Sequence, residues 1–244
     1  MTLIYEPAGR AREYAPLALN LYAGCTHGCT YCYAPAACRK HRDAFHASAA
    51  PRVDVIAKLE RELERNGHGA DRPPVLLCFT SDPYQPVAAQ AGVTRAAIQT
   101  LHARGYPVHI LTKAGTAAAA DFDILGELAG DAFASSLTFI SDRDSAKWEP
   151  HAAPPRDRRA AIVEAHARGI TTWASLEPVI DPEQTLDIIA LTHDVVDLFK
   201  VGTLNHHPHA DTIDWPAFAR QVVDLLESLG CAYYLKEDLR RSLD

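Results

Sequence analysis

Short apolar runs recur along the chain, and each is followed by a segment with helical periodicity. The runs are four to six residues long and rich in β-branched and aromatic residues, as buried strands are. Strands that alternate with helices at a spacing of about 30 residues predict βα units around a parallel sheet. The predicted strands cover residues 17–22, 75–79, 108–112, 136–140, 171–176, 198–201 and 232–235.

Amphipathic helices are predicted between these runs. Thr94 is expected to cap a helix that ends at Gly105, and Asp181 followed by Pro182 is a strong helix start. Another helix is expected to open at Pro216 and to end at Gly230. The expected apolar faces consist of Val53, Ile56, Leu59 and Leu63 in one helix and of Phe218, Val222, Leu225 and Leu229 in another.

No linker or shift in composition divides the chain, so we expect a single domain over residues 1–244. Six or seven βα units suit an open or closed α/β barrel better than two domains. In such a barrel, the functional side chains lie on the loops that follow the C-terminal ends of the strands. The search for chemistry therefore concentrates on those loops.

Composition and charge narrow the classes of function. Of the 244 residues, 48% are hydrophobic and 23% are charged, which is typical of a globular protein. No apolar run approaches the length of a membrane span, and the first residues contain no apolar signal segment. We therefore expect a cytoplasmic protein without membrane contact. The net charge of −7 argues against coating of nucleic acid by bulk charge, but basic clusters at residues 39–42 and 156–159 permit a local groove.

Three of the six cysteines lie within eight residues, in the loop expected after the first strand. Cys25, Cys29 and Cys32 have the spacing Cys-x3-Cys-x2-Cys, and thiolates on one tight loop can converge on a single centre. Structural zinc prefers four ligands in two separated pairs, and no second pair follows. Three cysteines without a fourth favour a [4Fe–4S] cluster with one open iron. Zinc remains an alternative, with Cys38 or His27 as the fourth ligand.

This motif, with Tyr31 directly before its last cysteine, resembles the signature of the radical S-adenosylmethionine (SAM) superfamily. The resemblance implies a partial (β/α)6-type TIM barrel with outer helices. It also implies that Cys25, Cys29 and Cys32 hold a [4Fe–4S] cluster whose open iron binds SAM. In this family an electron from the cluster cleaves SAM, and the resulting 5′-deoxyadenosyl radical abstracts hydrogen from a substrate. A reducing electron donor of the flavodoxin or ferredoxin type is then an expected partner.

SAM carries an ammonium, a carboxylate and a ribose, so its site needs polar groups at successive strand ends. Ser81 and Asp82 follow the second strand and are expected to accept from the ammonium, while Lys113 follows the third and is expected to pair with the carboxylate. The remaining candidates lie in the fourth and fifth strands and would reach the ribose or the substrate. The cofactor-binding residues that we expect are Tyr31, Ser81, Asp82, Lys113, Ser136, Ser175 and Glu177.

Within the superfamily, the chain is similar to the spore photoproduct lyase group, also called DNA repair photolyase-like proteins. The similarity rests on Tyr31-Cys32-Tyr33, on residues 80–84 (Thr-Ser-Asp-Pro-Tyr) and on Thr112-Lys113. In the lyase, a cysteine near the Ser-Asp pair returns a hydrogen atom to the product. The resemblance therefore makes Cys78 and Tyr33 candidate catalytic residues, with Cys231 a weaker candidate donor.

Three functions remain open from the sequence. The first is a radical enzyme of lyase or isomerase type that acts on a thymine-derived base in DNA, in modification or repair, and it predicts a basic rim near residues 39–42 or 156–159. The second is a radical SAM enzyme for a small molecule or peptide, with a closed, neutral or mixed pocket. The third is a non-enzymatic iron–sulfur protein for electron transfer, in which Cys38 or His27 completes the cluster. Near the C-terminus, Tyr233, Tyr234 and Lys236 are expected to close the barrel mouth.

Overall fold

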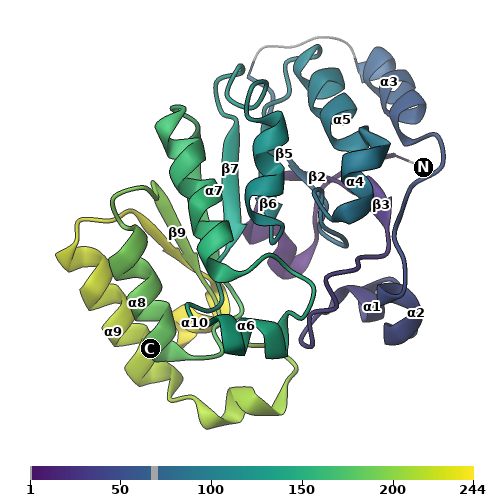
Figure 1. The fold of residues 1–244 in the computed structure, drawn as a ribbon. Coiled ribbons are helices and arrows are strands. Elements are labelled where there is room, and N and C mark those ends of the chain that lie inside the picture. Colours follow the sequence, from purple (N-terminus) through teal and green to yellow (C-terminus); the bar gives the residue numbers. More distant parts are fainter. Residues whose placement is uncertain (1, 67–70) are drawn as a thin grey trace.

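The computed structural model describes residues 2–66 and 71–244, and within them eight strands form one sheet (Figure 1). The strand order is β1-β2-β5-β6-β7-β8-β9-β10, and every neighbouring pair is parallel except β1 with β2. The strands are β1 (Ile4–Tyr5), β2 (Leu17–Leu19), β5 (Val75–Leu77), β6 (Val108–Thr112), β7 (Ala132–Ser136), β8 (Thr171–Leu176), β9 (Leu198–Val201) and β10 (Tyr233–Leu235).

Helices surround this open, mostly parallel sheet, which confirms the predicted α/β fold of the partial-barrel kind (Figure 1). The longer ones alternate with the parallel strands along the chain, as βα units require. The α-helices are α1 (Ala34–Ala37), α2 (Arg42–His46), α3 (Val55–Asn66), α4 (Pro86–Ala91), α5 (Val93–His102), α6 (Asp142–Trp148), α7 (Pro155–Ala167), α8 (Pro182–Thr192), α9 (Trp215–Ser228) and α10 (Glu237–Arg240).

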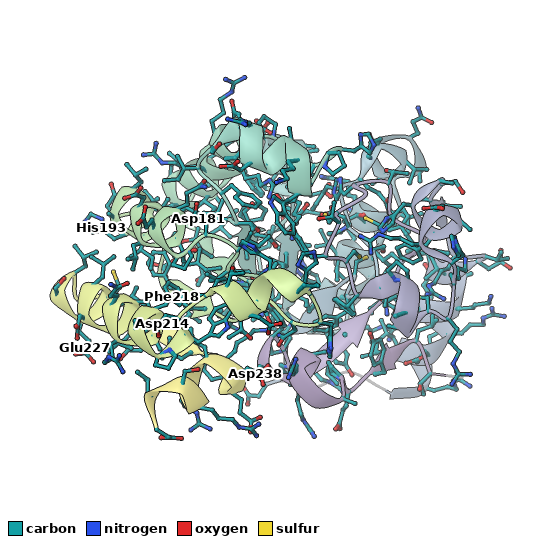
Figure 2. The ribbon with its side chains drawn as sticks, turned by 90° about the horizontal axis from the view of Figure 1, so that it is seen from below. Asp181, His193, Asp214, Phe218, Glu227 and Asp238 are labelled. Carbon is teal, nitrogen blue, oxygen red and sulfur yellow. The ribbon has the colours of Figure 1, made fainter. Side chains whose placement is uncertain are left out.

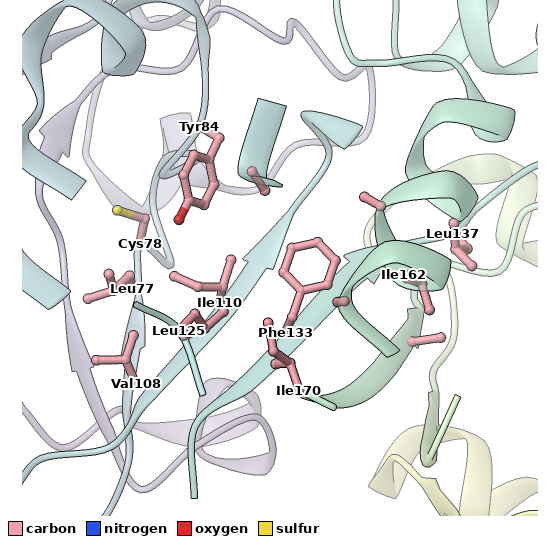
Figure 3. Close-up of a cluster of buried hydrophobic side chains, with 14 of the residues drawn as sticks. Leu77, Cys78, Tyr84, Val108, Ile110, Leu125, Phe133, Leu137, Ile162 and Ile170 are labelled. Atoms are coloured by element: carbon pink, nitrogen blue, oxygen red, sulfur yellow. The ribbon is translucent and has the colours of Figure 1, made fainter. Parts of the chain in front are cut away.

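Buried apolar side chains hold the helices to the outer face of the sheet. Figure 3 shows Leu77, Ile110 and Phe133 on successive strands of one buried cluster, with Phe133 nearest to Ile162 of α7. These four side chains have no more than trace exposure to solvent. Burial of one such side chain contributes about 1.5–3 kcal/mol to the stability of the fold. This apolar layer therefore holds the helices against the strands.

The strand prediction at residues 136–140 was displaced toward the C-terminus. The strand observed there is β7, with the sequence Ala-Phe-Ala-Ser-Ser, and every one of its residues is buried. Small residues fit a position covered on both faces, whereas the prediction had followed the bulkier apolar residues after it. Residues 137–140 instead form the loop that leads to α6. Only Ser136 belongs to both the predicted and the observed strand.

Two helix predictions had different outcomes. Asp181 caps α8 as expected, since its carboxylate accepts a hydrogen bond from the backbone N–H of Gln184 at 3.2 Å. Thr94 does not cap α5, because the helix already begins at Val93 after Gly92. The buried Thr94 hydroxyl instead donates to the carbonyl oxygen of Pro83 at 2.6 Å.

The N-terminal and C-terminal segments meet beside the sheet. Arg10, in the 3-10 helix η1 (Gly9–Glu13), forms an ion pair of 2.7 Å with Asp238, and Figure 2 shows Asp238 beside the N-terminal segment. The carboxylate of Glu13 accepts from the Tyr234 hydroxyl at 3.1 Å and from the backbone N–H of Glu237 at 2.8 Å. Within the described part of the chain, no helix is long and apolar enough to cross a membrane.

Candidate active site

A cavity of about 450 Å³ lies where the strands end, and loops from most of the sheet line it. Its wall contains eleven of the twelve predicted site residues: Cys25, Cys29, Cys32, Tyr31, Tyr33, Cys78, Ser81, Asp82, Lys113, Ser136 and Glu177. The twelfth, Ser175, does not line the cavity. Strand ends far apart in the sequence therefore bring nearly all of the predicted site residues to one place. This agrees with the expectation that functional residues of an α/β barrel lie at the C-terminal ends of its strands.

Helix α2 holds the cysteine loop through the carbonyl oxygens of the three cysteines. The His46 ring donates from Nδ1 to the carbonyl oxygen of Cys25 at 2.8 Å. The Arg42 guanidinium donates to the carbonyl oxygens of Cys29 and, at 3.3 Å, of Cys32. Each carbonyl of the motif thus has a side-chain partner on one short helix. This arrangement positions the loop through the protein's own contacts.

Gly24 permits the close approach between this loop and α2. It has φ of +80°, and a Cβ atom there would collide with the backbone oxygen of Ser48 and lie 3.0 Å from that of Phe45. A larger residue would push the loop away from α2, because both opposing atoms belong to the backbone. The glycine that precedes Cys25 is therefore required by packing.

The chemistry of the three thiols fits an iron–sulfur cluster. Burial raises the pKa of the Cys29 thiol to about 12, against a lowering effect of the nearby Lys113 ammonium. Burial also raises the pKa values of Cys25 and Cys32. Three thiolates are unfavourable in this setting unless a cationic centre binds them, and soft thiolates select iron–sulfur clusters or zinc. Cys25, Cys29 and Cys32 would therefore hold the cluster.

The two residues considered as a fourth ligand are placed differently. Cys38 does not line the cavity and packs against Cys25, Ala34 and Phe45. The His27 ring lies in the cavity wall, but its Nε2 is 3.1 Å from Asp82 Oδ2 and its Nδ1 is 3.1 Å from the carbonyl oxygen of His151. Within residues 2–66 and 71–244, no three Cys, His, Asp or Glu side chains converge closely enough to hold a single metal ion.

Asp82 is buried and joins the loops that follow β5 and β6. Its carboxylate accepts from the Thr112 hydroxyl and the Lys113 backbone N–H, both at 2.7 Å, and from the Tyr84 backbone N–H at 2.8 Å. Burial alone would raise its pKa, but His27 and these hydrogen bonds lower it to about 2. The carboxylate is thus ionised and already has partners within the protein, so its contact with an ammonium stays a prediction.

A buried ion pair behind Tyr31 was not anticipated from the sequence. The Tyr31 hydroxyl donates to Glu149, whose other carboxylate oxygen lies 2.6 Å from Arg158 Nη2. Burial would raise the pKa of Glu149, but Arg158 and then Lys113 lower it. Lys113 Nζ is 3.9 Å from Glu149 and 5.7 Å from the centre of the Tyr31 ring. Arg158 therefore supports the cysteine loop from inside the protein, through Glu149 and Tyr31. The sequence alone shows it only as part of the basic cluster at residues 156–159.

The opposite wall of the cavity is built around Glu177. Its carboxylate accepts from the Tyr14 hydroxyl and pairs with the ammonium of Lys236, which also lies 3.2 Å from the centre of the Tyr14 ring. Ser175 contributes indirectly, because its hydroxyl is 3.2 Å from that of Tyr14. The pair rests on Gly202, where a Cβ would lie 2.9 Å from the Cδ atoms of both Glu177 and Lys236.

Cys78 and Tyr33 both line the cavity near the end of β5. Cys78 lines the cavity with a left-handed backbone (φ 73°), and burial raises the pKa of its thiol to about 12, so it is neutral at pH 7. The Tyr33 hydroxyl donates to the carbonyl oxygen of Phe79, the residue after Cys78, at 2.7 Å. A neutral thiol retains a hydrogen atom, which is the chemical requirement for the donor role proposed for Cys78.

Comparison with known sequences identifies the family. The model of the radical SAM superfamily matches residues 19–195. Rv2578c of Mycobacterium tuberculosis, called an uncharacterized protein, is 29% identical over 170 residues, which cover 66% of this chain and 49% of that protein. The similarly described MJ0683 of Methanocaldococcus jannaschii is 23% identical over 166 residues, or 68% and 61% of the two chains. The chain thus spans about half the length of the mycobacterial relatives.

Solved structures share the fold. A variant of spore photoproduct lyase superposes with a TM-score of 0.69 at 13% identity, over 95% of this chain and 79% of the lyase. SuiB of Streptococcus suis, in a structure with bound S-adenosylmethionine, has a TM-score of 0.65 at 14% identity, over 89% of this chain and 49% of SuiB. Members of the family use a [4Fe–4S] cluster together with SAM, and the thiols of Cys25, Cys29 and Cys32 suit that cluster. The fold, the cysteine loop and the family match together show that this chain belongs to the radical SAM superfamily.

Proposed function

We propose that this protein is a radical SAM enzyme whose cavity holds the cluster, SAM and the substrate together. The observation that carries the proposal is that Cys25, Cys29 and Cys32 line one cavity while Cys38 lies outside it. When bound, the cluster and SAM supply one-electron cleavage of a sulfonium and abstraction of a hydrogen atom from the substrate. A cluster held by three cysteines has a free coordination position for SAM, which an electron-transfer centre with four protein ligands lacks.

The polar residues of the cavity divide the binding of SAM between them. Lys113 binds the carboxylate, because its ammonium lies in the cavity wall near the cysteine loop. Ser81 and Ser136 offer hydroxyl groups from two other strand ends, and Asp82 fixes the loop that carries Ser81. Glu177 reaches the ribose or the substrate from the opposite wall. Tyr31 is held by Glu149 and directly precedes Cys32, which would hold the cluster.

For the substrate, we propose a thymine-derived base in DNA and a lyase-type reaction. The support is the shared fold with spore photoproduct lyase, one structure of which is described as holding AdoMet and a dinucleoside spore photoproduct, with a TM-score of 0.64. In this reaction the Cys78 thiol would give a hydrogen atom to the product radical, and the thiyl radical left on Cys78 would take a hydrogen atom back from the methyl group of 5′-deoxyadenosine. Tyr33 positions the strand end that carries Cys78.

A peptide or small-molecule substrate is the second candidate. Arg42 and Arg158, one member of each basic cluster named by the DNA hypothesis, contact the cysteine carbonyls and Glu149 inside the protein, and Arg39, Lys40, Arg156 and Arg159 are not part of the cavity wall. SuiB, which shares the fold, has a structure described as bound to the precursor peptide SuiA, with a TM-score of 0.64. A substrate of this kind needs no extended contact with phosphate groups.

The deciding experiment is anaerobic reconstitution with iron and sulfide, followed by reduction with dithionite and addition of SAM. We expect formation of 5′-deoxyadenosine, its loss in Cys29→Ala together with the bound iron, and its retention in the matched control Cys38→Ala. Formation of 5′-deoxyadenosine by Cys29→Ala would refute the site. Transfer of deuterium into 5′-deoxyadenosine from a labelled thymine dinucleotide, and not from labelled peptides, would support the DNA substrate.

A further inference from the structure

A basic surface lies directly outside the cysteine loop. Helices α1 and α2 lie together beyond the main helical layer (Figure 1), and the link between them exposes Arg39, Lys40 and His41. None of these three side chains is part of the cavity wall. We call Arg39 and Lys40, with the turns of α1 and α2 that flank them, the basic cap.

The basic cap is joined to the cysteines by a short series of hydrogen bonds. Helix α1 begins directly after Tyr33, and the backbone N–H groups of Arg39 and Lys40 donate to the carbonyl oxygens of Ala36 at 3.0 Å and Pro35 at 2.9 Å. On the other side, Arg42 of α2 donates to the carbonyl oxygens of Cys29 and Cys32. The cap is therefore attached to the backbone of the cysteine loop.

The local charge is opposite to that of the whole chain. The exposed Asp43 carboxylate lies 3.6 Å from His41 (Oδ2 to Nδ1) and offsets one positive charge of this surface. Arg39, Lys40 and the partly buried Arg42 outnumber this single carboxylate, so the local charge is positive on a chain of net charge −7. Salt screens exposed charges beyond about 8–10 Å, so an acidic partner at this surface responds mainly to the cap.

We propose that the basic cap is the docking surface for an acidic one-electron carrier of the flavodoxin or ferredoxin type. The proposal rests on the proposed function, in which each cleavage of SAM needs one electron. The carrier is oxidised by one electron and the cluster is reduced from its 2+ to its 1+ state, with no atom transferred. Electrons cross a thin layer of protein, whereas the reacting atom of a substrate must enter the cavity. A surface outside the cavity but attached to the cysteine loop therefore suits a carrier better than a nucleic acid.

The test uses the double charge reversal Arg39→Glu with Lys40→Glu in the reconstituted full chain. The matched control is Arg65→Glu with Arg220→Glu, which changes the net charge equally at exposed positions on α3 and α9. Binding of an acidic flavodoxin is measured by calorimetry at low and high salt. Formation of 5′-deoxyadenosine is then driven either by flavodoxin with its NADPH-dependent reductase or by dithionite, which needs no docking surface.

We expect the cap variant to weaken flavodoxin binding by about tenfold or more at low salt and to slow the flavodoxin-driven reaction, because rim charges govern encounter. The dithionite-driven rate should stay within about twofold of the wild type, and the control variant should behave like the wild type. Unchanged flavodoxin affinity, or an equal loss in the control variant, overturns the proposal. So does a cap variant that loses affinity for a DNA duplex while it keeps flavodoxin binding.

Failure of the proposed function gives a different result. If dithionite yields no 5′-deoxyadenosine in the wild type, the radical SAM activity is refuted whatever the binding measurements show. Binding of oxidised flavodoxin needs no turnover and therefore tests the basic cap by itself. Neutral substitutions, Arg39→Gln with Lys40→Gln, should give an intermediate loss of affinity, which separates a charge effect from local misfolding.

Discussion

Arg158 Nη2 lies 2.6 Å from Glu149 Oε2, and both side chains are almost completely shielded from solvent. The same carboxylate accepts from the hydroxyls of Tyr31 and Thr138. The pair therefore connects α7 to the residue that precedes Cys32. It is a support for the cysteine loop that lies entirely inside the protein.

The first prediction follows from this pair. Arg158→Met should reduce the free energy of unfolding by about 3–5 kcal/mol, because it leaves the Glu149 carboxylate buried without its cation. Urea denaturation of the apoprotein measures the change. The double variant with Glu149→Gln should recover part of the loss, and equal stability of the single and double variants would contradict this account.

Gly202→Ala should separate Glu177 from Lys236, because the added Cβ would lie 2.9 Å from a carbon atom of each side chain. We expect a loss of stability of about 1–3 kcal/mol, typical of overpacking, and a several-fold rise in the KM for SAM or substrate. The matched variant is Lys236→Met, which removes the pair without adding bulk to the backbone. If both variants weaken binding through the same pair, their double variant should be less impaired than the sum of the two.

Cys78→Ala should leave the dithionite-driven formation of 5′-deoxyadenosine intact while the repaired product is lost or replaced by a side product. The reason is that Cys78 lines the cavity and keeps a neutral thiol, but is not one of the three thiols of the cysteine loop. Mass spectrometry of a dinucleotide substrate measures the products. Cys231→Ala, at a partly buried position outside the cavity wall, is the control and should give wild-type products.

His109 predicts a pH-dependent stability. Burial, and then the nearby Lys200 ammonium, lower the pKa of His109 to about 4, against a usual value near 6.5. Between these values the unfolded chain binds a proton that the folded chain does not, so stability falls as the pH drops from about 6.5 to 4. The loss is about 3 kcal/mol relative to a His109→Gln variant. Urea titrations of both proteins at pH 7 and pH 4.5 measure it, and parallel curves would refute the assignment.

The sequence predicted the parts of the site that depend on residues close together in the chain or at the ends of parallel strands. The spacing of Cys25, Cys29 and Cys32, and their place after the first parallel strand, are visible in eight residues of sequence. Most residues predicted at later strand ends, such as Lys113 and Glu177, also reach the cavity, since parallel strands present their C-terminal ends at one edge.

The missed residues act through contacts between distant segments. Tyr14 reaches Glu177 over 163 positions, and Tyr31 reaches Glu149 over 118 positions. Short sequence windows carry no signal for such pairs. The inward contacts of Arg42 and Arg158 could not be predicted either. A basic run in a sequence looks the same whether its arginines face solvent or a buried carbonyl or carboxylate.

The contacts of Arg10 and Glu13 with residues 234–238 have a consequence for biosynthesis. Lys236, which pairs with Glu177 in the cavity wall, is synthesised long after the cysteine loop. A nascent chain on the ribosome therefore exposes its three thiols long before the cavity wall around them is complete. Insertion of the iron–sulfur cofactor into such a chain would meet an open, oxygen-accessible loop, so we expect productive maturation only after residues 234–238 have been synthesised and have packed against Arg10 and Glu13.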